Sequence, residues 1–266
     1  MADPMPRNED LELVFEAYGV RVRVASDRPE ALDRVPALLP PNWRPCSPSA
    51  LDTTFTIRAV PDDKYELAQD GRVLVDAWQL DVALVVLERE LRAFVALEAP
   101  EHVFVHAGVV AHGGRAIVIP GETFAGKTTL VAALIRAGAV YYSDEYAVLD
   151  ESGRVHPYPK PLSLRERFTQ SDHHVEALGG VAGHEPVPAG MVLLTTYRPG
   201  AEWKPRRLSS GDAALALMQH TVPAQTRPAQ VLRAVTRCVE RAVVLQGERG
   251  AAESLAPLLL SEMSAG

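Results

Sequence analysis

The sequence contains few cysteines and no long apolar run, and each shortage excludes a class of protein. Its only cysteines, Cys46 and Cys238, lie far apart, so the chain lacks the disulfide framework of a small secreted domain and has no Cys-x-x-Cys metal pair. No uninterrupted apolar stretch approaches the roughly 20 residues that span a bilayer, and the first residues lack the apolar core of a signal peptide. We therefore expect a cytoplasmic protein with no membrane partner.

Clusters of positive charge are also missing. Lys and Arg never occur more than two in a row, and the formal net charge is -7. A nucleic-acid-binding protein needs a basic patch to neutralise phosphates, so we expect no nucleic-acid partner. The length of 266 residues and the 47% share of hydrophobic residues instead predict a globular protein of one large domain or two smaller ones.

Strand patterns dominate residues 1–100. Apolar residues alternate on both sides of Gly19, which predicts a hairpin, and an Asp70-Gly71 pair predicts a second tight turn between two strands. Apolar residues then recur at helical spacing over 80–97, before Pro100. We expect a smaller β-rich N-terminal unit, with strands at 11–25, 53–60, 64–69 and 72–77 and a closing helix.

Strands and helices alternate in residues 101–266. The pattern predicts an α/β fold, a mixed sheet with flanking helices. Expected strands cover 102–111, 115–120, 140–150, 191–199 and 242–247, and expected helices cover 128–138, 210–219, 226–241 and a stretch after Gly250.

A glycine-rich stretch, GETFAGKT at 121–128, separates a predicted strand from a predicted helix; we refer to it as the glycine loop. It fits the pattern G-x-x-x-x-G-K-[ST], in which backbone N–H groups surround the phosphates, the lysine neutralises them and the hydroxyl ligates Mg²⁺. Lysine is scarce here: the 27 Lys and Arg residues include only four lysines, one of which is Lys127. We predict ATP and Mg²⁺ as cofactors, bound by Gly121, Glu122, Thr123, Phe124, Ala125, Gly126, Lys127, Thr128 and Thr129.

Two adjacent carboxylates interrupt the apolar strand that follows the loop helix. In a sheet of this kind, Asp144 and Glu145 would reach the edge beside the phosphates. One would hold magnesium together with Thr128, and the other would accept the proton of an attacking hydroxyl, but the sequence does not say which does which. The alternative is a pair of solvated carboxylates in a turn.

A single histidine, His106, interrupts the apolar strand at 102–111. Taken alone, it is as readily a core histidine with satisfied hydrogen bonds as a member of a site.

These residues together resemble the catalytic domain of HPr kinase/phosphorylase and its HPr-kinase-related relatives. His106 precedes Gly121 by fifteen residues and the acidic pair begins seventeen residues after Lys127, as in that family. The resemblance implies a P-loop kinase domain of the HPr kinase and phosphoenolpyruvate carboxykinase type. It also implies that His106 lies near the transferring phosphate and that Asp144 and Glu145 serve as base and metal ligand.

The resemblance also extends to the acceptor. The first 100 residues look like those of shorter relatives, some of which phosphorylate a serine of a ribosomally made precursor such as that of a lasso peptide. Thr129 stands where the family has an acidic residue, and this leaves open whether phosphorolysis occurs. Lys160 and Arg165, in a proline-rich segment after the acidic pair, are candidates for contacting the transferred phosphoryl group, with Arg165 the catalytic candidate.

The sequence therefore predicts an ATP- and Mg²⁺-dependent kinase that transfers the γ-phosphate to an alcohol, most simply a serine of a peptide or small protein. A kinase for a small-molecule alcohol and a nucleotide-binding switch without transfer are the alternatives. A homo-oligomer is expected only by analogy with related kinases.

Overall fold

The computed structural model describes residues 11–121, 126–166 and 169–265, without the side chains of 164–166 and 169–172. The chain divides into two compact units, residues 1–100 and 101–266, which we describe separately as unit 1 and unit 2. Each unit contains a large mixed sheet, and six α-helices lie in the described part of the chain. In the same part, no helix is long and apolar enough to cross a membrane.

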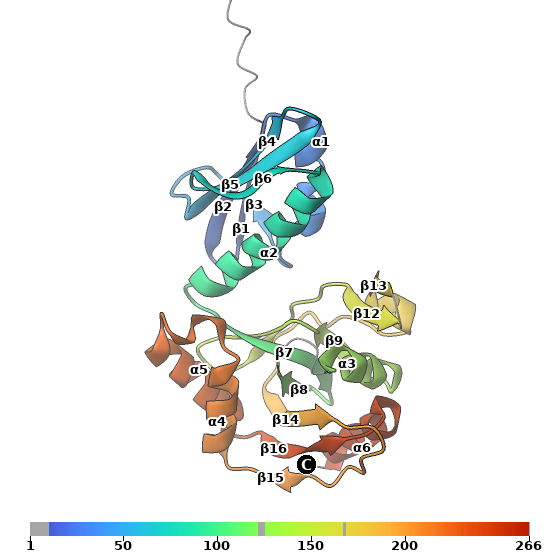
Figure 1. Cartoon of the computed structure of the whole chain (residues 1–266). Coiled ribbons are helices and arrows are strands. Elements are labelled where there is room, and N and C mark those ends of the chain that lie inside the picture. Colours follow the sequence, from blue (N-terminus) through green and yellow to red (C-terminus); the bar gives the residue numbers. More distant parts are fainter. Residues whose placement is uncertain (1–10, 122–125, 167–168, 266) are drawn as a thin grey trace, which may run out of the picture. The chain divides into compact units, whose positions relative to one another are not determined.

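Unit 1 is a six-stranded sheet with one long helix, coloured blue to green in Figure 1. The strand order is β3-β1-β2-β4-β5-β6, and β2 and β4 are parallel while the other neighbours are antiparallel. The strands are β1 (Leu11–Ala17), β2 (Val20–Ser26), β3 (Arg44–Pro45), β4 (Thr53–Val60), β5 (Lys64–Gln69) and β6 (Arg72–Trp78). The helices are α1 (Pro29–Leu32), a 3-10 turn at Val35–Leu38 and α2 (Leu80–Glu98).

Both predicted turns of unit 1 are confirmed. Tyr18-Gly19 and Asp70-Gly71 have positive φ at both residues, as the commonest two-residue hairpin turns require. The helix predicted over 80–97 is α2, which turns Leu84, Leu87 and Leu91 inward and contacts β5 and β6.

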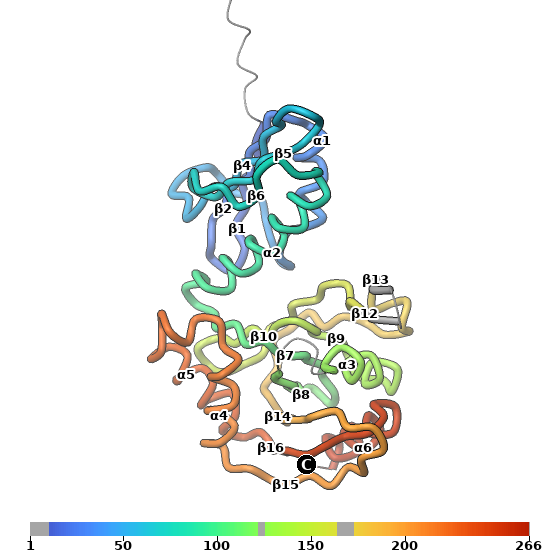
Figure 2. The backbone as a smooth tube through the Cα atoms, viewed as in Figure 1, coloured from blue at the N-terminus to red at the C-terminus, as the bar shows by residue number. Residues whose placement is uncertain are grey.

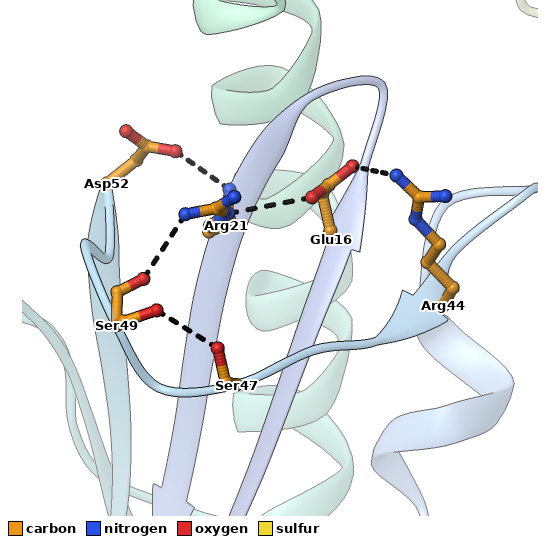
Figure 3. A network of polar contacts seen from close by, with 6 residues as sticks. All are labelled: Glu16, Arg21, Arg44, Ser47, Ser49 and Asp52. Carbon is orange, nitrogen blue, oxygen red and sulfur yellow. Dashed lines mark hydrogen bonds and ion pairs between the residues drawn. The ribbon is translucent and has the colours of Figure 1, made fainter.

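Surface polar contacts tie the short strand β3 and the following loop to β1 and β2 (Figure 3). Glu16 on β1 accepts a 2.7 Å hydrogen bond from Arg44 on β3, and Arg21 on β2 lies 3.5 Å from its other oxygen. The Arg21 backbone N–H donates to Asp52 at 2.7 Å. Exposed pairs of this kind contribute little to stability, so they mainly fix how the loop runs.

Unit 2 is built on an eight-stranded mixed sheet of order β11-β10-β7-β8-β14-β16-β15, with β9 also paired to β7. Strands β8, β14 and β16 are parallel neighbours; β8 and β16 are each followed by a helix, and β14 by a short strand and then a helix. The strands are β7 (Val103–His112), β8 (Arg115–Pro120), β9 (Val140–Ser143), β10 (Tyr146–Leu149), β11 (Val155–His156), β14 (Ala189–Tyr197), β15 (Arg206–Arg207) and β16 (Val243–Arg249), with a separate hairpin of β12 (Leu162–Glu166) and β13 (Thr169–His173). The helices are α3 (Lys127–Arg136), α4 (Ser210–Gln219), α5 (Pro228–Val239) and α6 (Ala252–Ala265), with 3-10 turns at Val175–Leu178 and Val222–Ala224.

Helices cover both faces of the unit 2 sheet, with α3 and α6 on one side and α4 and α5 on the other (Figure 1). One core cluster joins α3 and α6 to Met191 and Leu193 of β14 and Leu245 of β16. The second joins α4 and α5 to Val192 and Val244 of the same strands. We call these sides the α3 face and the α5 face. Because side chains alternate along a strand, every further residue of β14 and β16 can be assigned to one face.

One sequence prediction for unit 2 needs correction. The single strand predicted at 140–150 is two strands, β9 and β10, because the Ser143 hydroxyl accepts the N–H groups of Glu145 and Tyr146 at 3.0 and 2.9 Å and bends the chain there. The stretch after residue 168 begins with strand β13, which was not predicted. Farther along it, Ala182 and Val187 form bridges to Tyr141 and Val155.

Candidate functional site

The strand and the helix expected on either side of the glycine loop, β8 and α3, are present (Figure 2). Strand β8 ends at Pro120, and α3 begins at Lys127 after Gly126, whose left-handed φ of 78° favours glycine. Residues Glu122, Thr123, Phe124 and Ala125 lie outside the described residues, so their predicted role in binding phosphate stays a prediction.

The two ends of the loop are joined by its lysine. The Lys127 Nζ atom donates a 2.8 Å hydrogen bond to the carbonyl oxygen of Gly121. This contact holds the ammonium group between the end of β8 and the N-terminus of α3, where helix and side chain both contribute positive charge. The arrangement suits an anion.

A glycine in β7 lets α3 begin close to the sheet. A Cβ atom at Gly108 would lie 2.6 Å from the Val131 side chain and 3.7 Å from the Lys127 Cβ atom. Any other residue would push the start of α3 away from β7. Since His106 lies two residues earlier on the same strand, it shares this face of β7 with Gly108.

Asp144 lies beside the first turn of α3. Its carboxylate accepts hydrogen bonds from the Thr128 hydroxyl at 3.4 Å and from the Tyr141 hydroxyl at 3.2 Å. Burial, followed by the neighbouring charge of Glu145, raises the pKa of Asp144 above its ordinary value. Among the described side chains, no cation shifts the pKa of Asp144, and such a partly buried carboxylate would gain from binding one.

The Tyr141 side chain positions the Asp144 carboxylate through their hydrogen bond. Its hydroxyl oxygen also lies 2.8 Å from the carbonyl oxygen of Lys160, so the two acceptors share the single phenol proton and the proline-rich segment is attached next to the acidic pair. Burial raises the pKa of Tyr141 far above its ordinary value, and the phenol therefore remains a hydrogen-bond donor at neutral pH.

Glu145 and His106 come together through strand pairing. Tyr146 on β10 lies opposite His106 on β7, and the Ala107 N–H donates to the Glu145 carbonyl at 3.1 Å. The His106 ring stacks at a tilt on Tyr146, with centroids 4.8 Å apart. Although His106 is exposed overall, this shielding lowers its pKa, and Glu145 partly opposes the shift while Lys127 adds to it. A neutral imidazole at neutral pH is the consequence.

Of the predicted residues, then, the structure brings together Gly121, Gly126, Lys127, Thr128, Asp144, Glu145 and His106. Thr129 is exposed on α3. Arg165 belongs to β12, opposite Gln170, but its side chain lies outside the described residues, so its catalytic role stays a prediction. In the described part of the chain, no three His, Cys, Asp or Glu side chains form a group that could hold a metal alone.

One residue of this edge was missed by sequence reasoning. Arg249 at the end of β16 is only 2% exposed, and its Nη2 atom donates a 2.8 Å hydrogen bond to the carbonyl of Gly126. Its guanidinium carbon lies 5.3 Å from the centroid of the Tyr197 ring at the end of β14. The expected strand stopped at residue 247 because Glu248 and Arg249 are charged, so no sequence signal placed this arginine against the loop.

A cavity of about 680 Å³ opens at the carboxyl ends of β8, β14 and β16, next to the start of the glycine loop. Its walls are polar: two cations, two threonines, a histidine and a glutamate contribute to them. The lining residues are Pro120, Gly121, Leu194, Thr195, Thr196, Lys204, Arg206, His220, Gln246, Gly247 and Glu248.

Comparison with known proteins gives distant structural similarity alone. No family model and no curated protein matches the chain. A solved structure of the Hpr(Ser) kinase/phosphatase from Coxiella burnetii matches with 16% sequence identity and a TM-score of 0.33, over 61% of this chain and 93% of that one. A similarity of this size does not establish membership of that family.

Proposed function

We propose that the chain is an ATP- and Mg²⁺-dependent kinase that transfers the γ-phosphate of ATP to an alcohol, most simply the serine hydroxyl of a peptide or small protein. One observation carries the proposal: Lys127, Thr128 and Asp144 gather at the N-terminus of α3, where the glycine loop ends. A cation, a hydroxyl and a carboxylate at a helix N-terminus are the groups that a magnesium nucleotide needs.

Each group has a part in the proposed reaction. Lys127 and the helix N-terminus would bind the phosphates, while Thr128 and Asp144 would hold Mg²⁺, which would neutralise phosphate charge. The 3.4 Å contact between Thr128 and Asp144 favours Asp144 as the metal-side carboxylate. Glu145, on the side of His106, is then the group that accepts the proton.

In the transfer step the acceptor oxygen forms a bond to the γ-phosphorus as the bond to the ADP oxygen breaks. The hydroxyl proton would pass to Glu145, and ADP would be the leaving group. Neutral His106 can donate a hydrogen bond to the transferring phosphoryl group, a role in which it stabilises charge without carrying any.

The cavity beside Gly121 favours a second candidate acceptor. Its volume of about 680 Å³ lies within the range of small-molecule sites, and Lys204 and Arg206 suit an anionic alcohol. Peptide and small-molecule acceptors should therefore be tested side by side.

The experiment is transfer of label from γ-³²P-ATP to serine peptides and to small anionic alcohols in the presence of Mg²⁺. We expect labelled acceptor with the wild-type protein, and its loss in Lys127→Ala and Glu145→Gln. Lys64→Ala, which removes another of the scarce lysines from unit 1, controls for ATP binding. Nucleotide binding without transfer to any alcohol would favour a nucleotide-binding switch instead.

A further inference from the structure

If the proposed nucleotide site is correct, the packing of β14 and β16 indicates where the purine base of ATP binds. The acidic pair and His106 lie on the β7, β9 and β10 side of the glycine loop, where the γ-phosphate would react. The other side of the loop is formed by the ends of β14 and β16. A nucleotide whose γ-phosphate points to the acidic pair would extend its nucleoside toward these ends.

An aromatic ring lies on that side, on the face that carries α3. Leu193 and Leu245 point to the α3 face, so the alternation along each strand places Tyr197 and Arg249 there too. Tyr197 is close to the loop itself, because a Cβ atom at Gly126 would lie 4.0 Å from its Cβ atom. The tyrosine is 53% exposed, which leaves ring surface open to a ligand.

Arg249 ties this ring to the loop. One guanidinium group donates to the Gly126 carbonyl through Nη2 and to the Gly250 carbonyl through Nη1, and it lies under the Tyr197 ring. Among the described residues the charge of Glu253 acts on it, but burial outweighs that effect, and its buried Nε atom lacks a hydrogen-bond partner. A buried cation at the start of a helix is costly unless an anion is bound nearby.

We propose that Tyr197, backed by Arg249, is the platform on which the purine base of ATP stacks. A ring held at a fixed distance from Gly126 keeps base and phosphates in one binding mode, and stacking on an aromatic face suits a planar base. Arg249 is a positioning residue in this scheme, since it acts through the ring and the loop backbone. Burial lowers its pKa, which fits a site that gains from a bound anion.

The test compares ATP with tripolyphosphate, which carries the same phosphates without a nucleoside. Binding is followed with Mg²⁺ by calorimetry and by the fluorescence of Trp203, the one tryptophan in the sequence of unit 2. We expect Tyr197→Ala to weaken ATP binding by roughly 5- to 100-fold and to leave tripolyphosphate binding unchanged. Tyr197→Phe keeps the ring and should bind both ligands like the wild type.

Arg249→Met retains most of the side-chain volume and should weaken the binding of both ligands, with Arg249→Lys restoring part of the tripolyphosphate affinity. A wild type that binds neither ligand would overturn the proposed function and the platform together. A wild type that binds ATP while Tyr197→Ala binds it equally well would overturn the platform alone. A Thr196→Tyr variant, which fills the neighbouring cavity, tests the other place for the base. The platform would also be overturned if Thr196→Tyr lost ATP binding but kept tripolyphosphate binding, while Tyr197→Ala bound both like the wild type.

Discussion

The two units differ in whether they bury a charged side chain. Unit 1 buries Ser26 and Thr53, which are neutral: Ser26 accepts the Arg28 N–H at 3.1 Å and Thr53 donates to Asp70 at 2.7 Å. Unit 2 likewise buries two neutral residues with hydrogen-bond partners, Ser143 and Thr221, but it also buries the charged Arg249, whose Nε atom has no partner among the described residues, and partly buries Asp144. Matched neutral groups shape turns at little cost, whereas unmatched charges cost stability. The difference indicates that unit 2 keeps charges that its fold does not need, around the glycine loop.

The strongest test of this difference is Asp144→Asn, which should separate stability from activity. Because the pKa of Asp144 is raised by burial, its ionised form opposes folding, so the neutral variant should have a higher Tm at pH 7. Phosphoryl transfer should fall by about 10²-fold or more as the magnesium ligand is lost. Calorimetry and a transfer assay check the two effects. A lower Tm with activity intact would mean that Asp144 is an ordinary structural carboxylate.

Two glycines with left-handed φ test packing in the two units. A Cβ atom at Gly153 of unit 2 would lie 2.4 Å from the backbone nitrogen of Cys238 in α5, whereas one at Gly71 of unit 1 would meet nothing within 4 Å. We expect Gly153→Ala to cost about 2–5 kcal/mol of unfolding free energy, since α5 must move. Gly71→Ala should cost only about 1–2 kcal/mol of backbone strain. Equal losses in denaturant unfolding would contradict the packing described for α5.

Removing a carboxylate of unit 1, Asp70, should change the stability in the opposite direction to Asp144→Asn. Asp70 accepts the Thr53 hydroxyl at 2.7 Å and the Thr54 N–H at 2.8 Å. Asp70→Ala removes both acceptors and should lower the unfolding free energy by about 1–3 kcal/mol. ATP binding by unit 2 should be unaffected. If Asp70→Ala instead raised the Tm, as expected for Asp144→Asn, the contrast between the units would fail.

The smallest expected effect is a difference in pH dependence. Hydrogen bonding by Arg44 lowers the pKa of Glu16 below 4.5, so the stability that Glu16 contributes is present above that pH and is lost as pH falls through its folded pKa. Asp144 has the opposite sign: its folded pKa is above 3.8, and its contribution becomes unfavourable as pH rises through the folded value. Thus Glu16→Gln should lower the Tm slightly at pH 7, and this loss should shrink as pH falls through the folded pKa of Glu16. A loss of Tm that did not shrink with falling pH would assign the effect to packing rather than charge.

Local signals in the sequence were enough for much of the fold. Gly19 and the pair Asp70-Gly71, each between alternating apolar residues, predicted the two hairpin turns in which the structure has positive φ. Helical periodicity located α2 and α3. The polar strand β13, with the sequence TQSDH, has no apolar alternation to reveal it. Its pairing with β12 comes from the tertiary fold.

The candidate site was only partly readable for the same reason. Lys127 stands out because lysine is scarce in this chain. Asp144 and His106 stand out because each is a polar residue in an otherwise apolar strand pattern. Arg249 is one of many arginines, and its contact with Gly126 spans 123 residues of sequence. The faces of β14 and β16, which decide where Tyr197 points, are set by the helices that pack on them.

The central claim is that the N-terminus of α3 binds a magnesium nucleotide. Calorimetric titration of ATP with Mg²⁺ into the wild-type protein and into Lys127→Ala measures this directly, with Lys64→Ala as the control for loss of a lysine. We predict saturable binding by the wild type and by Lys64→Ala, weakened at least about tenfold in Lys127→Ala. No binding by the folded wild type, or equal binding by Lys127→Ala, would contradict the account.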